Sequence, residues 1–249
     1  MNIKGMSRDG LADYVTAQIS HFFPDGQGGL RAAIARDIDE ALDREQTCIN
    51  AVRLWKADEF DYLHSSQYCI FLHYLANTIW RNRQDQTVCT KLFLLNKALN
   101  GFDCFYDNAL PDRFFIGHSV GIVLARTTFS DYLVLYQNST VGKNHGDAPV
   151  LGQGVVLYPN SAIIGKCHIG AGTVVAQGCS IINRDTPGDC YVFSNGDDLL
   201  FKAPKRNVLA DIFRLEEGSD QCPTTTAKSS NTPWPKSAST RRFANASST

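Results

Sequence analysis

Aliphatic residues recur at a strict six-residue step in the second half of the chain. This period fits neither an α-helix nor a single strand, whose faces repeat about every 3.6 and 2.0 residues. A step of six is typical of hexapeptides stacked into a parallel β-helix, in which each hexapeptide buries one side chain and turns one corner. Small or β-branched residues follow four positions later, where a corner needs them. The aliphatic series is Leu151, Leu157, Ile163, Ile169, Val175 and Ile181, and the corner series is Val155, Ser161, Cys167, Thr173 and Cys179.

The same pattern continues upstream in a weaker form. Three residues keep the step and a fourth resumes it after a slip of one position: Leu110, Ile116, Ile122 and then Leu133. Residues 142–149 interrupt the pattern with a polar segment that contains Gly142 and Gly146. We interpret this segment as a loop extruded from one coil. Loops on rigid scaffolds often carry binding groups, so it is a candidate site, and the alternative is a tolerated insertion.

The first hundred residues have a different texture. Between residues 8 and 100 there are only four glycines, and apolar residues follow helical spacing. The helical sets are Leu30, Ile34, Ile38, Ala41 and Leu42, then Cys69, Leu72, Leu75, Ala76 and Ile79, then Leu92, Leu95 and Leu99. We predict an α+β protein with a helical domain over residues 1–100 and a β-helix over residues 101–206.

Residues 207–249 are predicted to hold a short amphipathic helix and then a Ser/Thr-rich tail. From about Gly218 the chain has almost no large apolar residue, so it cannot bury enough surface to offset its ordering entropy. We expect that tail to be disordered and its removal to leave folding unchanged.

Composition limits the environment and the partners. A formal net charge of −1 gives no reason to expect nucleic acid or an acidic membrane surface. The eight cysteines show no CxxC pair and no Cys/His ligand spacing, which favours reduced, space-filling thiols. The N-terminus lacks the apolar stretch of a signal peptide, and no run is long enough to span a bilayer. We therefore expect a cytoplasmic protein without membrane insertion.

His118 and Asp103 are the candidate catalytic pair. Asp103 lies fifteen residues before His118, close to the length of one three-hexapeptide turn, so successive coils can bring the two together. A carboxylate beside an imidazole fixes the ring tautomer and stabilises the imidazolium that forms when a hydroxyl is deprotonated. The pair can therefore act as a general base. The alternative is a structural histidine and a turn aspartate.

Several segments resemble bacterial serine O-acetyltransferases. They are residues 100–105, 117–123, 136–142 and 149–152 with the coils to Val175, and residues 51–53 and 68–81 in the helical part. The resemblance covers roughly residues 45–205. It implies a left-handed β-helix behind an N-terminal helical domain, transfer of acetyl from acetyl-CoA to the serine hydroxyl, and a role in cysteine biosynthesis. It also implies that Asp103 and His118 form the catalytic dyad, in a homotrimer or a dimer of trimers.

Three positions depart from the family pattern. The family's Asp before the catalytic His is replaced by Gly117, and its Arg-His pair before the loop-closing Pro is replaced by Asp147 and Ala148. Its Asp beyond Ala-Val-Arg is replaced by Lys56, although Asp58 stands two residues on. In the family these groups hold the ammonium and carboxylate of serine, and an Asp-Ala pair cannot replace an Arg fork. We therefore expect serine to bind poorly.

Acetyl-CoA is the expected co-substrate. In the family it lies in the groove between adjacent prisms of a trimer, against small residues of successive coils and basic residues near the C-terminal end. The matching positions are Gly142, Lys143, Pro159 and Ala171, with Lys202, Lys205 or Arg206 for the phosphates. The family's closing motif is replaced here by residues 195–198, where two acids would repel a phosphate. The alternative for residues 202–206 is a solvated charge cluster.

Three functions compete. The first is an acetyl-CoA-dependent O-acetyltransferase of serine acetyltransferase type that acts on serine or another small hydroxyl compound. The second is the same chemistry on a sugar or nucleotide sugar in polysaccharide synthesis. The third is a metal-dependent protein of carbonic anhydrase type, with His118, His145 and His168 around zinc at a trimer interface.

We favour the first function and expect no metal, because no ligand pair shows helical or strand spacing. The acceptor itself stays open. We expect Asp58, His145 and Asp147 to contact it from the helical domain and the extruded loop.

Overall fold

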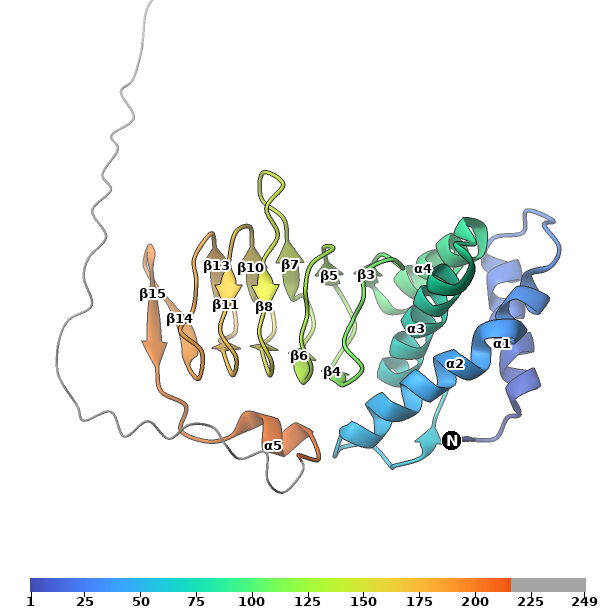
Figure 1. The fold of residues 1–249 in the computed structure, drawn as a ribbon, viewed down its shortest axis with the longest axis horizontal. Coiled ribbons are helices and arrows are strands. Elements are labelled where there is room, and N and C mark those ends of the chain that lie inside the picture. The colour runs from blue at the N-terminus through green and yellow to red at the C-terminus, as the bar shows by residue number, and fades with distance from the viewer. Residues whose placement is uncertain (216–249) are drawn as a thin grey trace, which may run out of the picture. The chain divides into compact units, whose positions relative to one another are not determined.

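The computed structural model describes residues 1–215, which form one compact unit of helices followed by a parallel β-helix (Figure 1). The predicted fold class is confirmed. The helical region comprises β1 (Asn2–Ile3), α1 (Arg8–Phe22), α2 (Leu30–Ala51), β2 (Glu59–Phe60), α3 (Ser65–Arg83) and α4 (Gln86–Asn100). Helix α3 packs against both α2 and α4.

Helix α3 is the centre of the helical region. Every residue from Ser66 to Ile79 is buried, so the helix is covered all round rather than on one face. Polar side chains begin the outer helices: Ser7 accepts a hydrogen bond from the Gly10 amide in α1, and Asp85 accepts one from the Val88 amide in α4. The predicted helical sets lie on buried faces except for Leu99, which is 41% exposed on α4.

Residues 102–202 form the β-helix, whose strands stack into three sheets. The β3 sheet contains β3 (Phe102–Cys104), β5 (Ile122–Leu124), β7 (Thr140–Gly142), β10 (Ala162–Ile164) and β13 (Ser180–Ile182). The β4 sheet contains β4 (Phe114–Ile116), β6 (Leu133–Leu135), β9 (Val156–Leu157), β12 (Val174–Val175) and β14 (Tyr191–Asn195), with β15 (Asp198–Lys202) antiparallel at its end. The β8 sheet contains β8 (Val150–Leu151) and β11 (His168–Ile169). All other pairings in these sheets are parallel.

The predicted hexapeptide register is confirmed. Leu151 pairs with Ile169, Leu157 with Val175 and Ile163 with Ile181, so each inward residue lies directly over the equivalent residue of the next coil. All members of the aliphatic series and all members of the corner series are buried. Polar corner residues also bond the carbonyl three residues earlier, as the Ser161 hydroxyl does to Tyr158 at 2.7 Å. A corner therefore favours a side chain that is both small and able to donate.

The segment after β7 is the predicted extruded loop. The backbones of Asn144 and Asp147 exchange hydrogen bonds of 2.9 and 3.0 Å, which closes a tight hairpin at its tip. His145 and Gly146 make the turn at positive φ. In Figure 1 this loop projects from the upper edge of the β-helix between β7 and β8. Its side chains are thus presented to solvent from a fixed base.

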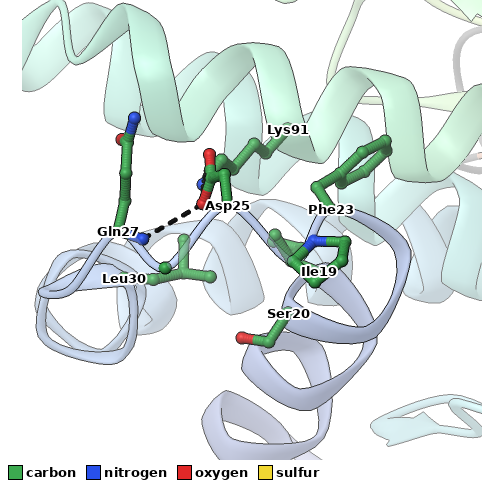
Figure 2. A pocket seen from close by; sticks show the side chains of 9 residues that line it. Ile19, Ser20, Phe23, Asp25, Gln27, Leu30 and Lys91 are labelled. Carbon is green, nitrogen blue, oxygen red and sulfur yellow. Dashed lines mark hydrogen bonds and ion pairs between the residues drawn. The ribbon is translucent and has the colours of Figure 1, made fainter.

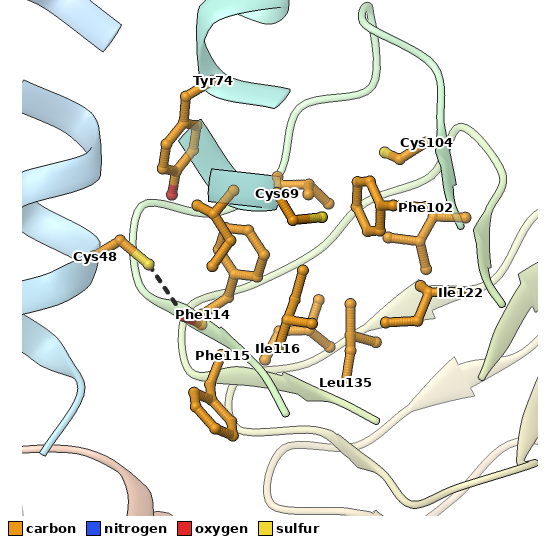
Figure 3. Close-up of a cluster of buried hydrophobic side chains, with 14 of the residues drawn as sticks. Cys48, Cys69, Tyr74, Phe102, Cys104, Phe114, Phe115, Ile116, Ile122 and Leu135 are labelled. Atoms are coloured by element: carbon orange, nitrogen blue, oxygen red, sulfur yellow. Dashed lines mark hydrogen bonds between the residues drawn. The ribbon is translucent and has the colours of Figure 1, made fainter. Parts of the chain in front are cut away.

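The first coil of the β-helix packs against helices α2 and α3 (Figure 3). The Cys48 thiol donates to the Phe114 carbonyl at 3.1 Å across this junction. Glu45 is also fully buried here, and neither of its carboxylate oxygens has a hydrogen-bond partner among the described residues. Burial raises the pKa of Glu45 well above its ordinary value, because the charged carboxylate loses its hydration. The seven cysteines in residues 1–215 are free and buried, as predicted, and Cys222 lies outside the described residues.

Residues 203–215, which we call the strap, run back from β15 along the β-helix to the helical domain (Figure 1). The strap contains α5 (Val208–Ile212) and ends beside α2, where the Arg53 amide donates to the Ile212 carbonyl at 2.7 Å. The Arg214 guanidinium then donates to the carbonyls of Asn50, Val52 and Trp55 at 2.6–3.0 Å. The sequence indicated only a short amphipathic helix here, and the docking partner was not foreseen.

Outward valines lie along the β4 sheet and are buried. These are Val134, Val156 and Val174, none more than 5% exposed.

The expected tail from Gly218 onward lies outside the described residues. Within residues 1–215, no helix is long and apolar enough to cross a membrane.

Candidate functional site

His118 lies at the corner that follows β4, on the first coil of the β-helix. Its side chain is exposed, whereas the next residue, Ser119, is buried. The Gly117 amide donates to the Leu135 carbonyl at 2.9 Å, and the Gly121 amide donates to the Gly101 carbonyl at 3.0 Å. The corner is therefore tied to the next coil on one side and to the end of α4 on the other. An exposed imidazole on such a fixed backbone is well placed to act on a bound molecule.

Asp103 stands in β3, and its side chain points outward because Phe102 and Cys104 on either side are buried in the core. Its carboxylate is paired with the Lys97 ammonium at 2.7 Å. Lys97 lies in the last turn of α4, so the helical domain holds this carboxylate in place. Within residues 1–215 no hydrogen bond or ion pair joins Asp103 to His118. The dyad therefore stays a prediction, in which the second carboxylate oxygen would serve the imidazole.

Gly117 has a neighbour that no sequence pattern revealed. The parallel register places Tyr136 beside it on the next coil, and a Cβ at position 117 would stand 2.6 Å from two atoms of the Tyr136 ring. Tyr136 stacks in turn on Tyr158 of the following coil, with ring centroids 5.5 Å apart and planes 19° apart. Burial raises the pKa of both tyrosines, so both phenols are protonated at neutral pH.

These residues belong to one outward column along the β4 sheet. From the first coil to the last its members are Gly117, Tyr136, Tyr158, Ala176 and Phe193. Neighbouring strands are spaced by about 4.8 Å, so the column runs roughly 19 Å from Gly117 to Phe193. It connects the corner that carries His118 to the C-terminal end of the β-helix.

A cavity of about 340 Å³ opens at that C-terminal end. Its lining combines aromatic rings with cationic side chains: Tyr191, Phe193, Lys202, Ala203, Lys205 and Arg206. The Lys202 ammonium lies 5.2 Å from the centre of the Phe193 ring. The structure thus brings together the three predicted candidates for phosphate contact, Lys202, Lys205 and Arg206. The aromatic floor was missed from sequence, although the alternation of Tyr191 and Phe193 on a strand was a usable signal.

The remaining predicted co-substrate residues do not gather in one chain. Gly142 and Lys143 lie at the base of the extruded loop, where a Cβ on Gly142 would contact Ile164. Pro159 follows Tyr158 on the same corner as His118, and its carbonyl accepts from the Gly178 amide. Ala171 lies on another corner, between the β8 and β4 sheets. Such a distribution is compatible with a groove only if a second chain supplies the facing wall.

The predicted acceptor contacts are also separated. Asp58 accepts hydrogen bonds from the Gln46 and Asn50 amides, which lower the pKa of its carboxyl, and it lies beside the β1–β2 pair. His145 and Asp147 lie on the extruded loop and are exposed. In Figure 1 the β1–β2 pair lies near the N mark at the lower edge, whereas the loop projects from the upper edge. A single chain therefore does not bring Asp58 to the loop.

A second cavity, of about 300 Å³, lies in the helical domain between the loop after α1 and helix α4 (Figure 2). The Lys91 ammonium pairs there with the Asp25 carboxylate at 2.8 Å, and this contact lowers the pKa of Asp25. Ile19, Phe23 and Leu30 supply its apolar lining. None of the predicted site residues lies in this cavity.

The three histidines considered for zinc stand at different places. His118 follows β4, His145 tips the extruded loop and His168 lies in β11, where it faces Asp185 at 3.5 Å. Within residues 1–215 no three His, Cys, Asp or Glu side chains are gathered as a metal site needs.

Comparisons with known proteins find similarity to serine acetyltransferases. Serine acetyltransferase 2 of Arabidopsis thaliana is 25% identical over 178 residues, which make up 69% of this chain and 52% of the relative. The chain thus spans about half the length of that curated relative. No family model matches the chain.

Solved structures agree on the fold. The serine acetyltransferase of Neisseria gonorrhoeae matches with a TM-score of 0.64 at 15% identity over 83% of each chain. A serine acetyltransferase solved in complex with CoA matches with a TM-score of 0.61 at 15% identity, over 80% of this chain and 86% of that chain. The chain is therefore similar in sequence to serine acetyltransferases and shares their fold.

Proposed function

We propose that this protein is an acetyl-CoA-dependent O-acetyltransferase. The observation that carries the proposal is the outward column of the β4 sheet, which links an exposed imidazole to an aromatic and cationic cavity about four strand spacings away. Acetyl-CoA has matching parts: a planar adenine, phosphates, and an extended arm that ends in the thioester. The sequence similarity to serine acetyltransferases and the CoA complex of a structural relative support this assignment.

The cavity suits the nucleotide end of the co-substrate. Lys202, Lys205 and Arg206 offer positive charge for phosphates, and the rings of Tyr191 and Phe193 offer an apolar floor for a base. Repulsion between the CoA phosphates and the acids near the β14–β15 turn is reduced, because the Asp198 carboxylate is paired with Arg184 at 3.0 Å. The pantetheine arm would then follow the column past Ala176 toward His118.

The chemistry requires one base. His118 takes the proton of the acceptor hydroxyl while its oxygen attacks the thioester carbonyl, so a C–O bond forms and the C–S bond breaks. The imidazolium returns the proton to the departing CoA thiolate. Asp103, held by Lys97, would orient the imidazole and stabilise its charged form. The other predicted contacts, Gly142, Lys143, Pro159, Ala171, Asp58, His145 and Asp147, remain part of the proposal as groups on the facing walls of the groove.

We further propose a homotrimer, which can associate into a dimer of trimers, in the cytoplasm. The separation of the predicted contacts over different corners of one chain supports a trimer, because neighbouring prisms would bring these corners together. Apolar side chains on the outer face of the β3 sheet also support it: Val123 is 43% and Ile182 is 51% exposed.

The first experiment is release of CoA thiol from acetyl-CoA with hydroxyl acceptors. We expect His118→Ala to lower turnover by roughly 10²–10⁴-fold, because the general base is lost. CoA binding, measured by calorimetry, should change little, since the cavity lies at the other end of the column. Asp103→Asn should act in the same direction with a smaller loss, since the base remains but is poorly oriented.

His168→Ala is the matched control, because His168 is an exposed histidine on a later coil. It should leave both turnover and CoA binding unchanged. Wild-type turnover in His118→Ala would refute the assigned base, and failure of the wild type to bind CoA would refute the acyl donor.

A further inference from the structure

The corner beside His118 is closed to side chains at position 117. A Cβ there would stand 2.6 Å from both Cδ1 and Cε1 of Tyr136, well inside van der Waals contact. The space that a residue before the histidine would use is thus occupied by an aromatic ring from the next coil. Only glycine fits while that ring stays in place.

Tyr136 is not free to move away. One face of its ring stacks on Tyr158, and Phe115 approaches its edge with centroids 6.4 Å apart and planes at 77°. Swinging the ring out would break both aromatic contacts. The Tyr136 hydroxyl, however, has no hydrogen-bond partner within residues 1–215 and is not among the buried unpaired groups. It is therefore available to a bound molecule.

The charges around the corner fit a neutral ligand. The outward carboxylate of the first coil, Asp103, is already paired with Lys97 at 2.7 Å, so it is not a free partner for an ammonium. The extruded loop joins β7 to β8 and so lies at the corner between the β3 and β8 sheets, whereas His118 lies at the corner between the β4 and β3 sheets. Within one chain its basic residues, Lys143 and His145, therefore stand at a different corner from His118. A zwitterion placed here would lose its water without gaining charged partners, which is costly for both groups.

We propose that Tyr136 determines acceptor specificity and that the acceptor is a neutral polyhydroxyl compound, a sugar or sugar derivative, rather than a free amino acid. This rests on the acetyl transfer proposed above and names its acceptor class. The acceptor hydroxyl loses its proton to His118 and gains the acetyl carbon as the C–S bond of acetyl-CoA breaks. A neighbouring hydroxyl of the same sugar receives the hydrogen bond of the Tyr136 phenol.

The test compares acceptors at saturating acetyl-CoA. L-serine and L-homoserine represent zwitterions, whereas glycerol, galactose, maltose and N-acetylglucosamine represent neutral hydroxyl compounds. We expect the best neutral acceptor to exceed L-serine by at least about 10²-fold in kcat/KM, because a site without charged partners discriminates strongly against charges. A higher kcat/KM for L-serine than for every neutral compound overturns the proposal.

Variants locate the discrimination at Tyr136. Tyr136→Phe keeps the ring and removes the hydroxyl, so it should raise KM for the neutral acceptor and leave serine excluded. The double variant Gly117→Asp/Tyr136→Ala removes the ring and adds a carboxylate before His118, so the ratio of serine to sugar kcat/KM should rise by roughly 10-fold or more. An unchanged ratio in a folded double variant contradicts the role given to Tyr136.

Gly117→Asp alone is expected to lower the melting temperature, because the ring blocks its Cβ. Circular dichroism and thermal melts accompany each variant to separate folding from specificity.

CoA binding to the wild type distinguishes failure of the proposed acceptor class from failure of the proposed acetyl transfer. If CoA binds and serine is the preferred acceptor, the proposed acceptor class is wrong and the proposed acetyl transfer is retained. If CoA does not bind the wild type, both proposals are wrong.

Discussion

The late coils and the first coils of the β-helix are built differently. Between Leu151 and Ile181, equivalent inward residues lie eighteen positions apart, as Leu157 and Val175 do. In the first coils the spacing is twenty positions between Phe102 and Ile122 and nineteen between Ile116 and Leu135. The early coils also face the helical domain: β3 lies against α4, β4 lies against α2, and Phe114 meets Tyr74 of α3. Among the described residues, the late coils pack against other coils and against the strap.

This difference in coil spacing shows which part of the β-helix serves only as a scaffold. Late coils need only to stack, so one small corner residue and one aliphatic residue per hexapeptide suffice. The first coils must also bury the helical domain and present His118 beside Tyr136. Each of these tasks changes the spacing or a residue of the repeat. The six-residue period therefore identifies the β-helix scaffold. Departures from this period mark the first coils, which contact the helical domain and carry His118.

The regular region should be the least tolerant of charge. Ile163 is fully buried between Val141 and Ile181 of the adjacent coils. Ile163→Asp would bury an unpaired carboxylate and cost several kcal/mol, so we expect insoluble or unfolded protein. Soluble yield and a thermal melt measure this.

Ala162→Asp is the matched control, because residue 162 is the outward neighbour on the same strand. It should fold. A cooperative melt of Ile163→Asp at the wild-type temperature would show that the assigned register is wrong.

The strap should contribute next. Phe213 is fully buried, and its ring meets Tyr132 edge-on with centroids 5.1 Å apart. Phe213→Ala should lower the free energy of unfolding by about 3–5 kcal/mol, measured by urea denaturation. Asp211→Ala, an exposed change on α5, should stay within about 0.5 kcal/mol of wild type. Equal stability of the two variants would mean that the strap does not hold the two regions together.

Much of the late region could be predicted from the sequence, because a period of six leaves few alternatives. The strap could not be predicted. Its docking contacts are Tyr132, the Gly154 corner and backbone carbonyls at the end of α2, which come together only after the β-helix has formed. Residues 208–215 alone show a short amphipathic pattern and nothing of its partner.

The site was partly predictable for a similar reason. His118 and Asp103 could be found by residue type and spacing, and Lys202 and Lys205 by charge. The filling of the Gly117 corner by Tyr136 depends on cross-coil register in the irregular part of the chain. The ion pair of Asp103 with Lys97 likewise depends on how α4 meets β3, which no local pattern encodes.

Glu45, buried where the helical domain meets the first coil, predicts a pH dependence of folding stability of intermediate size. The folded pKa of Glu45 is raised above its unfolded value, so the folded state binds the extra proton and stability falls as pH rises above about 4.3. The slope from this one group approaches about 1.4 kcal/mol per pH unit until the raised pKa is reached. Glu45→Gln should remove that slope, as measured by urea denaturation between pH 5 and pH 8.

Asp43→Asn, an exposed acid on the same helix, is the control for Glu45→Gln and should keep the wild-type slope. Identical pH profiles for wild type and Glu45→Gln would contradict the burial of an unpaired acid at the junction.

The smallest effect is expected at the far end of the regular region. Lys202→Gln removes one exposed cation from the aromatic cavity, so CoA affinity should fall by up to about 5-fold, and less at high salt. Calorimetric titration with CoA checks this. Lys166→Gln, at an exposed corner, should have no effect. Equal affinities for both variants would remove the cavity from the co-substrate site.

The strap also changes how the whole unit comes apart. In an open solenoid each turn interacts only with its neighbours, so the last turn can fray while the first remains intact. Here Arg214 follows the last turn in the chain but bonds carbonyls near the first, including that of Val52, 162 positions earlier. This contact links the C-terminal end of the β-helix to its N-terminal end. It can form only late in folding, because both ends must already be folded. The C-terminal turn is therefore secured from the opposite end of the molecule, and unfolding should begin with release of the strap rather than with the terminal turn itself.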